Sequence, residues 1–318
     1  MKLIVIIPCL NEAATLPVVL KTIPKKITGI DKIEIVVIDD GSTDKTVEVA
    51  KMNGVKHFVS HIKNQGLSVS FCDGLNQALK LGADIIVLTD GDNQYPQKRI
   101  PDLIEPILKH KADLVIADRQ IQTIDHFSAT KKMWQRFGTW VMNLAAGTNV
   151  PDGTSGFRAY SRDAALQLNL IAKYSFATET TIQAGNKGQA IAFIKIKTNA
   201  KTRESRQFTS SWQHVRKSSI TIMRGFVMYK PYAVFFSLGL LLLVVGLIPF
   251  IHYFVLYFSV KSPGGAHHLQ SLIIGTVLLT ASFISFTLGV IADLIRINRR
   301  LLEDILEHTR RNDFSKHP

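Results

Sequence analysis

The sequence predicts an α/β domain with an open, mostly parallel sheet, followed by an amphipathic helix at a membrane surface and two helices that cross the membrane. Two observations predict this class. Short runs rich in Ile, Val and Leu alternate with amphipathic stretches in the first two thirds of the chain, and two long runs without Asp, Glu, Lys or Arg follow. Nearly continuous β-branched runs are typical of parallel strands that are buried on both faces.

The strands and helices are expected to alternate along the chain. We expect strands at residues 3–8, 34–39, 85–89 and 114–117, and helices at residues 12–23, 44–52, 68–81 and 101–110. A β-α-β-α order favours an open parallel sheet, in which ligands bind beyond the carboxyl ends of the strands. The candidate site therefore includes the polar residues after these strands, which are Asn11 and Glu12 and the stretches 39–42 and 90–92.

Four segments are expected along the chain. They are a cytoplasmic α/β domain (1–210), an amphipathic juxtamembrane helix (211–230), a two-helix transmembrane hairpin (231–295) and a basic cytoplasmic tail (296–318). The apolar runs 233–258 and 269–291 each exceed the roughly 20 residues that cross a bilayer. Trp212, Val215, Ile222 and Phe226 share one helical face, which favours an interfacial helix. An ordinary core-facing helix is the alternative.

The formal net charge of +13 allows nucleic acid, an anionic membrane surface or an anionic substrate as partner. Basic residues cluster on both sides of the apolar runs: Lys201, Arg203, Arg206, Arg216, Lys217, Arg224 and Lys230 before them, and Arg296, Arg299, Arg300, Arg310 and Arg311 after them. This position favours lipid headgroups and disfavours nucleic acid. The loop between the runs carries one cation, Lys261, so the positive-inside rule predicts a two-span protein of the cell membrane with both ends cytoplasmic.

Cysteine usage disfavours two other classes. Cys9 and Cys72 are the only cysteines, and neither has a partner spacing or a nearby histidine pair. A disulfide framework and a zinc site are therefore disfavoured, and a reducing compartment is expected for the α/β domain.

The strongest local motif is Thr89-Asp90-Gly91-Asp92-Asn93-Gln94, directly after a buried hydrophobic run. Carboxylates at i and i+2 can reach one cation if the backbone turns between them, and Gly91 permits the turn. Mg²⁺ and Mn²⁺ prefer oxygen ligands and leave positions for phosphate oxygens, where they offset charge on a departing diphosphate. The alternative is a plain turn, because Asp and Gly favour turns.

A second acidic motif, Asp39-Asp40-Gly41-Ser42-Thr43-Asp44, also follows a strand and precedes a helix. One of Ser42, Thr43 and Asp44 is sufficient to cap that helix. Because capping needs only one of them, the motif contains a surplus acid. We expect the side chain of Asp39 or Asp40 to point into the crevice, toward the base or ribose of a nucleotide.

Four motifs together support a named resemblance. They are Pro8-x-x-Asn11-Glu12, Asp39-Asp40-Gly41-Ser42, Asp90-x-Asp92 with Gln94, and Ser155-Gly156-Phe157-Arg158-Ala159. In this order and at these intervals the chain resembles, over nearly its whole length, family-2 glycosyltransferases of the dolichyl-phosphate mannose synthase and polyprenyl-phosphate glucosyltransferase kind. The resemblance implies a GT-A-like fold. It also implies metal-dependent, inverting transfer of a hexose from a nucleotide diphosphate sugar to a polyprenyl (undecaprenyl or dolichyl) phosphate.

The resemblance also implies roles for individual residues. The nucleotide pocket would be lined by Pro8, Asn11, Glu12, Asp39, Asp40 and Asp90. Mg²⁺ or Mn²⁺ would be held by Asp90, Asp92 and Gln94. The acceptor phosphate would be contacted by Arg119, Arg158 and either Lys131 or Lys132. The catalytic set would be Asp92, Glu179 near the sugar, and Arg203 and Arg206 in a basic loop over the diphosphate.

The chain departs from the family pattern at two places. The loop Asn64-Gln65-Gly66-Leu67-Ser68 lacks a lysine that is often present near the nucleotide. Lys131 or Lys132 replaces an arginine, and lysine keeps the charge but loses the planar fork. An ordinary surface pair with Asp118 or Asp163 is the alternative for Arg119 and Arg158.

Two other functions stay open at this stage. One is transfer to a hydroxyl of a glycolipid or polysaccharide, which requires a general base. The other is a non-enzymatic, nucleotide-binding membrane scaffold. The sequence also leaves open the sugar, the base of the donor, the polyprenol, the preferred metal and whether the chain forms a homo-oligomer.

Overall fold

The computed structural model describes residues 1–120, 129–170, 176–199, 223, 227–259 and 269–315. The chain divides into two compact units, Met1–Gly225 with Glu303–Pro318, and Phe226–Leu302. Arg203, Arg206 and most of the expected amphipathic helix 211–230 lie outside the described residues.

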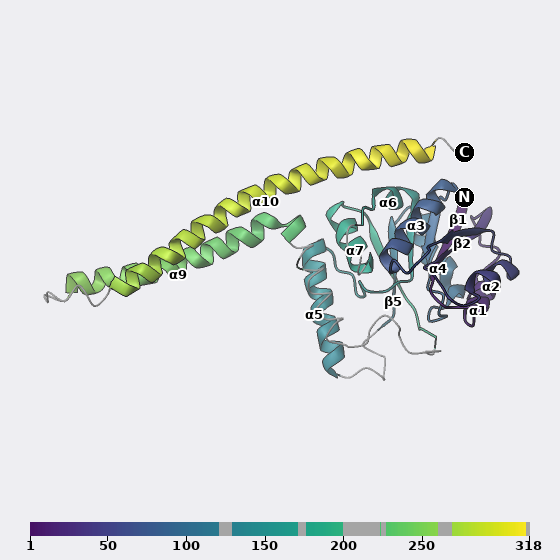
Figure 1. Ribbon diagram of the computed structural model, residues 1–318, viewed down its shortest axis with the longest axis horizontal. Helices are drawn as coiled ribbons and strands as arrows, with labels where there is room; N and C mark the ends of the chain where they lie inside the picture. Colours follow the sequence, from purple (N-terminus) through teal and green to yellow (C-terminus); the bar gives the residue numbers. More distant parts are fainter. Residues whose placement is uncertain (121–128, 171–175, 200–222, 224–226, 260–268, 316–318) are drawn as a thin grey trace. The chain divides into compact units, whose positions relative to one another are not determined.

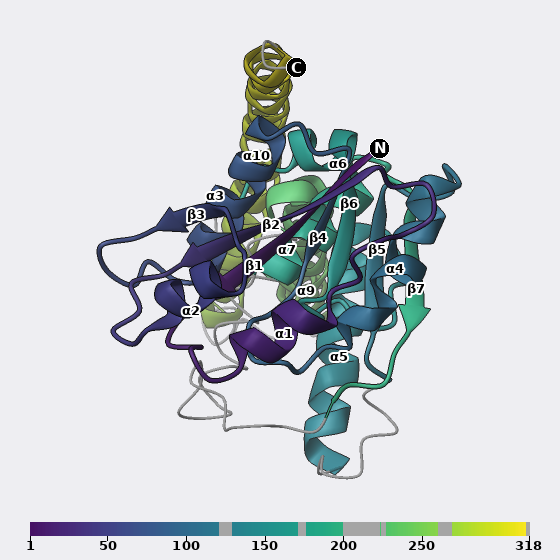
Figure 2. The same ribbon diagram turned by 90° about the vertical axis from the view of Figure 1, so that its right-hand side faces the viewer.

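The first unit is built on a seven-stranded sheet with the order β3-β2-β1-β4-β6-β5-β7 (Figures 1 and 2). The strands are β1 (Lys2–Cys9), β2 (Lys32–Asp39), β3 (His57–Ser60), β4 (Ile85–Leu88), β5 (Leu114–Asp118), β6 (Arg158–Ser161) and β7 (Ile191–Lys195). All pairs are parallel except those of β6, which runs antiparallel to both β4 and β5.

Helices cover both faces of this sheet. One face carries α1 (Leu16–Thr22), α2 (Thr46–Met52), the short turn η1 (Gln97–Arg99) and α4 (Ile100–Leu108), and the other carries α3 (Leu67–Lys80), α6 (Arg162–Gln167) and α7 (Phe176–Asn186). Alternate residues of β1 face opposite layers: Val5 joins the core with Leu16 of α1, whereas Ile6 lies against Gly74 of α3. Burial on both faces explains the continuous apolar runs.

The predicted α/β class with a mostly parallel sheet is confirmed. Each expected strand appears within two residues of its expected bounds, for example β1 at Lys2–Cys9 for residues 3–8. Three strands were not expected, namely β3, β6 and β7, each of four or five residues.

The direction of β6 matters for the site. Because β6 is antiparallel, its first residue, Arg158, pairs with Leu88 of β4 and Ile116 of β5 near their carboxyl ends. The stretch 155–157 before β6 therefore reaches the same edge of the sheet as the polar residues that follow β1, β2 and β4.

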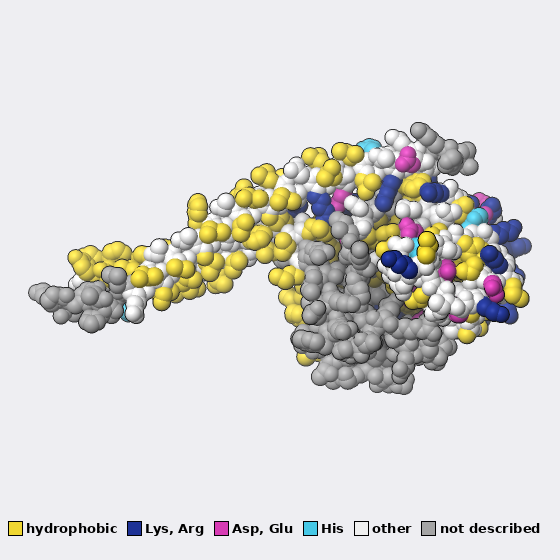
Figure 3. Space-filling view, viewed as in Figure 1, with side chains coloured by type: hydrophobic (Ala, Val, Ile, Leu, Met, Phe, Trp, Pro, Cys, Tyr) yellow, Lys and Arg dark blue, Asp and Glu magenta, His cyan; other side chains and the backbone are white. Residues whose placement is uncertain are grey.

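The second unit contains α9 (Pro231–Ser259) and the first part of α10 (Leu269–Ser315). Both helices are long and apolar enough to cross a membrane by length and composition, and hydrophobic side chains line their surfaces in Figure 3. Small residues allow the two helices to pack closely. Ser282 Oγ donates to the Gly239 carbonyl at 2.7 Å, and Ser285 Oγ donates to the Phe235 carbonyl at 2.8 Å.

Helix α10 continues past residue 295, where the expected span ends, and its last turns belong to the α/β unit. Arg311 pairs with Asp163 of α6 at 2.7 Å, and Arg310 donates to the Leu168 carbonyl. These two arginines therefore have protein partners in the α/β unit, and their expected place among lipid headgroups stays a prediction.

Candidate active site

The loops after β1 and β2 are joined through Asn11. Its backbone has a positive φ of 55°, and its side-chain Oδ1 accepts from the Thr43 amide at 2.8 Å. The Asn11 amide in turn donates to Ser42 Oγ at 2.9 Å. Asn11 therefore fixes the relative position of two loops at the expected nucleotide edge.

The adjacent acids after β2, Asp39 and Asp40, accept hydrogen bonds from different neighbours. Asp39 Oδ1 accepts from the Ser42 amide at 3.1 Å, and Asp44 Oδ1 accepts from the Thr46 amide at the start of α2. Asp40 accepts from backbone amides of the loop that follows β3, so its carboxylate points toward that loop. Pro8 is buried within β1, where it pairs with Ile38.

Three carboxylates gather around Gly91, directly after β4. A Cβ added to Gly91 would lie 3.3 Å from Glu12 Cγ, and Thr15 Oγ1 lies 2.8 Å from both the Gly91 carbonyl oxygen and Glu12 Oε2, to either of which it can donate its one hydrogen. Burial, together with the charges of Asp92 and Glu12, raises the pKa of Asp90 above its ordinary value, and Arg119 opposes this rise. Such crowding of negative charge is expected where a cation binds.

These residues fit a divalent cation of the Mg²⁺ or Mn²⁺ type. Asp90 and Asp92 supply hard oxygen ligands at a strand end, and the electrostatic cost of the cluster falls when a cation is bound. The described part of the chain holds no group of three or more His, Cys, Asp and Glu side chains arranged for a metal. Two carboxylates with substrate phosphates are, however, the usual way in which proteins hold Mg²⁺.

The loop that carries Asp92 is held by Asn199, which follows β7. Asn199 Nδ2 donates to the carbonyls of Asn93 at 2.9 Å and Tyr95 at 3.2 Å, and its amide donates to the Gln94 carbonyl at 2.9 Å. Asn93 has a positive φ of 59°, a conformation that Asn tolerates better than most residues. Sequence reasoning missed Asn199, and no local signal marks it.

Gly156 lies directly against Asp90. Its amide donates to Tyr95 Oη at 2.9 Å, and Tyr95 stacks on Phe157 with ring centroids 5.4 Å apart. A Cβ added at Gly156 would lie 3.3 Å from both Asp90 Oδ2 and Tyr95 Oη. Burial raises the pKa of Tyr95 to about 12, so the phenol stays protonated at neutral pH.

We expect Gly156→Ala to reduce turnover by about tenfold or more, because a misplacement of catalytic groups by even a fraction of an ångström is costly. The added methyl group must displace the Asp90 carboxylate or the Tyr95 ring. Initial rates at saturating donor would measure the effect. Gly138→Ala is the matched control, since a Cβ there meets no atom within 4 Å. Equal rates for the two variants would contradict the close contact of Gly156 with Asp90 and Tyr95.

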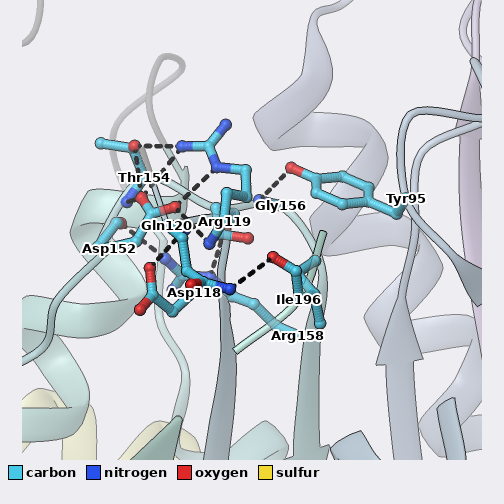
Figure 4. A network of polar contacts seen from close by, with 11 residues as sticks. Tyr95, Asp118, Arg119, Gln120, Asp152, Thr154, Gly156, Arg158 and Ile196 are labelled. Carbon is cyan, nitrogen blue, oxygen red and sulfur yellow. Dashed lines mark hydrogen bonds and ion pairs between the residues drawn. The ribbon is translucent and has the colours of Figure 1, made fainter. Parts of the chain in front are cut away.

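Arg119 forms a bidentate ion pair at the end of β5 (Figure 4). Its Nε and Nη2 donate to the two oxygens of Asp152 at 2.7 and 3.0 Å, and Nη2 also donates to Thr154 Oγ1 at 2.7 Å. The Asp152 side chain is 2% exposed. Asp118, the partner considered from the sequence, instead accepts from the Gln120 amide at 2.8 Å. The alternative considered from the sequence, an ordinary surface pair of Arg119 with Asp118, is therefore wrong, and the expected contact of Arg119 with the acceptor phosphate stays a prediction.

Arg158 is fully buried, which corrects its expected contact with the acceptor phosphate. Its Nη1 donates to Thr180 Oγ1 and Thr181 Oγ1 of α7 at 2.8 and 3.0 Å. Its Nη2 and Nε donate to the carbonyls of Gly153 and Ser155, both at 2.7 Å. Because all three nitrogens bind protein oxygens, Arg158 fastens the loop before β6 to α7 and has no surface for a ligand.

The other expected site residues are placed less completely. Glu179 is buried in the first turn of α7 and accepts from Gln183 at 3.5 Å. Lys131 and Lys132 lie in α5 (Ala129–Ala146), but their side chains lie outside the described part of the structure. The roles of these residues, and those of Arg203 and Arg206, stay predictions.

Helix α5 exposes an apolar face that the sequence reasoning missed. Met133, Phe137, Trp140 and Leu144 are each about half exposed or more, and their spacing of four, three and four residues places them on one helical face. Exposed contiguous apolar surface marks sites of protein or membrane interaction. The helical spacing was present in the sequence and could have predicted this face.

The comparison with protein families decides the class of this protein. Residues 4–168, more than half of the chain, match the sequence profile described as Glycosyl transferase family 2. The chain belongs to this family. The resemblance stated from the four motifs is thereby confirmed, and the protein is a family-2 glycosyltransferase.

Two relatives and one solved structure resemble this glycosyltransferase. An undecaprenyl-phosphate mannosyltransferase of Micrococcus luteus is 27% identical over 206 residues, which cover 62% of this chain and 83% of that protein. A dolichol-phosphate mannosyltransferase of Pyrococcus furiosus is 30% identical over 218 residues, which cover 62% of this chain and 60% of that protein.

The solved structure is the glucosyl-3-phosphoglycerate synthase from Mycobacterium tuberculosis in complex with Mn²⁺, uridine diphosphate and phosphoglyceric acid. It superposes with a TM-score of 0.56 at 21% identity, over 71% of this chain and 77% of that chain. This likeness shows the fold, and the predicted GT-A-like sheet is confirmed.

Proposed function

We propose that this glycosyltransferase moves a hexose from a nucleotide diphosphate sugar to a polyprenyl phosphate, with Mg²⁺ or Mn²⁺, at the cytoplasmic face of a cell membrane. The observation that carries the donor half is the acidic cluster of Glu12, Asp90 and Asp92 at the carboxyl edge of the sheet, beside the fixed cation Arg119. The names of the two relatives support the polyprenyl-phosphate acceptor.

The chain's own residues supply positioning and charge. A cation held by Asp90, Asp92 and Gln94 would act as a Lewis acid on the departing diphosphate. Arg119, oriented by Asp152, keeps a positive charge close enough to Asp90 to affect its pKa. The acceptor phosphate is already an anion at neutral pH and needs no strong base, so we propose a direct attack that inverts the anomeric carbon.

A lipid acceptor also agrees with the apolar surfaces. Helices α9 and α10 carry membrane-spanning lengths of apolar residues, and α5 exposes Phe137 and Trp140 with their rings 6.0 Å apart. Aromatic side chains are favoured at the interface between membrane and water. We propose that the α5 face contacts the bilayer or the lipid chain of the acceptor.

Replacing both Phe137 and Trp140 by serine should raise the KM for a long-chain polyprenyl phosphate by about tenfold or more, because two large apolar side chains no longer bury their surface. The donor KM should stay unchanged. Steady-state kinetics in mixed micelles would measure both constants. Met52→Ser, at an exposed position of α2, is the control. A rise in donor KM with no change for the lipid would refute the proposed contact.

The reaction itself can be tested with membranes that contain the protein and a panel of labelled uridine- and guanosine-diphosphate sugars. The proposal predicts cation-dependent label in an organic-solvent extract, released by mild acid, because a sugar joined to a phosphate is acid-labile. An extractable product that resists mild acid would instead indicate a hydroxyl acceptor, with the buried Glu179 as the candidate base. No transfer from any donor would favour the scaffold function.

A further inference from the structure

His61 lies between two carboxylates directly after β3. Its Nδ1 is 2.7 Å from Asp40 Oδ1, and its Nε2 is 3.0 Å from Asp73 Oδ2 on α3. The His61 side chain is 5% exposed, that of Asp40 7% and that of Asp73 41%. The His61 amide also donates to the Asp39 carbonyl at 2.9 Å. This cluster lies beside the donor residues, but none of the roles described above uses His61.

Asp40 joins His61 to the far end of the same loop. Its two oxygens accept from the amides of Gln65 at 2.8 Å and Gly66 at 2.9 Å. The loop also lies directly on Gly41, where φ is +77° and an added Cβ would be 2.8 Å from the Lys63 backbone. The Asp40 carboxylate therefore fixes both ends of the loop 61–66, and the loop packs closely against the stretch 39–42.

The two carboxylates beside the ring favour a charged imidazole. A neutral ring has one N–H and can donate to only one of the two carboxylates, whereas an imidazolium donates to both. Burial alone would lower the pKa of His61, but hydrogen bonds to Asp40 and Asp73 outweigh burial and raise its pKa above the ordinary value. Asp40 at the end of β2 and Asp73 on α3 are the charged groups that face the ring.

We propose that His61 is a positioning residue for donor binding, whose imidazolium bridges Asp40 and Asp73 and so holds the loop 61–66 against the nucleotide edge at Asp39. The proposal rests on the proposed function, since it assumes that this edge binds a nucleoside diphosphate. The loop contacts the stretch at Asp39 in two ways: the His61 amide donates to the Asp39 carbonyl, and the loop packs on Gly41.

The sign of the pH dependence follows from the bridge. The imidazolium is present below the raised pKa of His61 and is lost as the pH rises through that value. One ring nitrogen then carries no proton and can no longer donate to the carboxylate that it faces. The dissociation constant for uridine or guanosine diphosphate, whichever the protein binds with Mn²⁺, should rise by about tenfold as the pH passes upward through the raised pKa of His61. Deprotonation of Asp90 acts on Mn²⁺ binding with the opposite sign, and this effect is common to the wild type and the variants below.

Three variants test the assignment. His61→Gln should weaken binding at low pH by about tenfold and abolish the rise, because glutamine does not titrate. Asp73→Asn, at a half-exposed position, should keep the fold and move the rise to lower pH, since one carboxylate that favours the charged ring is gone. His57→Gln is the control, because His57 begins the strand that precedes His61 but lies 3.5 Å from Glu34, and it should keep the wild-type profile.

A second readout does not depend on nucleotide. In protein labelled with ¹³C at histidine, the signal that disappears in His61→Gln should titrate above the ordinary histidine value. A His61 signal at the ordinary value, or an unchanged binding profile in Asp73→Asn and His61→Gln, would overturn this role alone. If the wild-type protein binds neither nucleoside diphosphate, the proposed function and this role both fail.

Discussion

Replacing Asp92 by alanine should reduce sugar transfer by about a thousandfold or more, while expression and membrane insertion stay intact. Asp92 is a half-buried loop residue that accepts from the Gln94 amide, so its loss leaves the core unchanged. The proposed cation would lose a carboxylate ligand, and with it the stabilisation of the leaving diphosphate, which is worth several kcal/mol. Initial rates measured across a range of Mn²⁺ and Mg²⁺ concentrations would show the loss.

Asp102→Ala is the matched control for this experiment. Asp102 is exposed on α4 and pairs with Arg99, so its removal should leave the rate unchanged, as is usual for surface ion pairs. If Asp92→Ala kept the wild-type rate and the wild-type dependence on metal concentration, the assignment of the cation site would have to be given up.

Replacing Asp152 by alanine should lower the free energy of unfolding by about 3–5 kcal/mol, because it leaves the Arg119 guanidinium without its buried partner. Asp163→Ala offers a close comparison, since both aspartates pair with an arginine at 2.7 Å and differ in burial. The Asp163 side chain is 68% exposed, so its loss should cost about 1 kcal/mol or less.

Denaturation of the detergent-solubilised protein would compare the two variants. Asp152→Asn adds a further arm, because it keeps the shape of the side chain but removes its charge, and it should fall between wild type and Asp152→Ala. Equal shifts for Asp152→Ala and Asp163→Ala would show that the pair of Arg119 with Asp152 behaves as an ordinary surface contact.

The fold could be predicted where a strand has a distinctive pattern of apolar residues in the sequence. The apolar runs of β1, β2, β4 and β5 are buried on both faces, and this burial produces a signal that no loop would carry. Strand β6 has no such signal, because it has four residues and begins with Arg158. Its strand conformation comes from pairing with β4 and β5, in agreement with the strong context dependence of strand formation.

The candidate site could be predicted only where its geometry is local. Asp90 and Asp92 are two residues apart, so one turn places them together. Arg119 and Asp152 are 33 residues apart, and Asn199 is 106 residues from Asn93, so their contacts depend on the packing of whole strands. Arg158 was expected at the acceptor phosphate because it matches the arginine of the family's Ser-Gly-Phe-Arg stretch and a guanidinium fits phosphate. In the structure, neutral oxygens of the loop and of α7 accept its hydrogen bonds instead.

The central claim is that a divalent cation and the strand-end carboxylates together bind an activated sugar. Equilibrium titration of the purified protein with uridine- and guanosine-diphosphate sugars, with Mn²⁺ or Mg²⁺ and again after chelation, tests it most directly. Binding of one nucleotide type that requires the cation and disappears in Asp92→Ala is the expected result. Binding that is equally tight after chelation, or no binding of either nucleotide type with either cation, would contradict the claim.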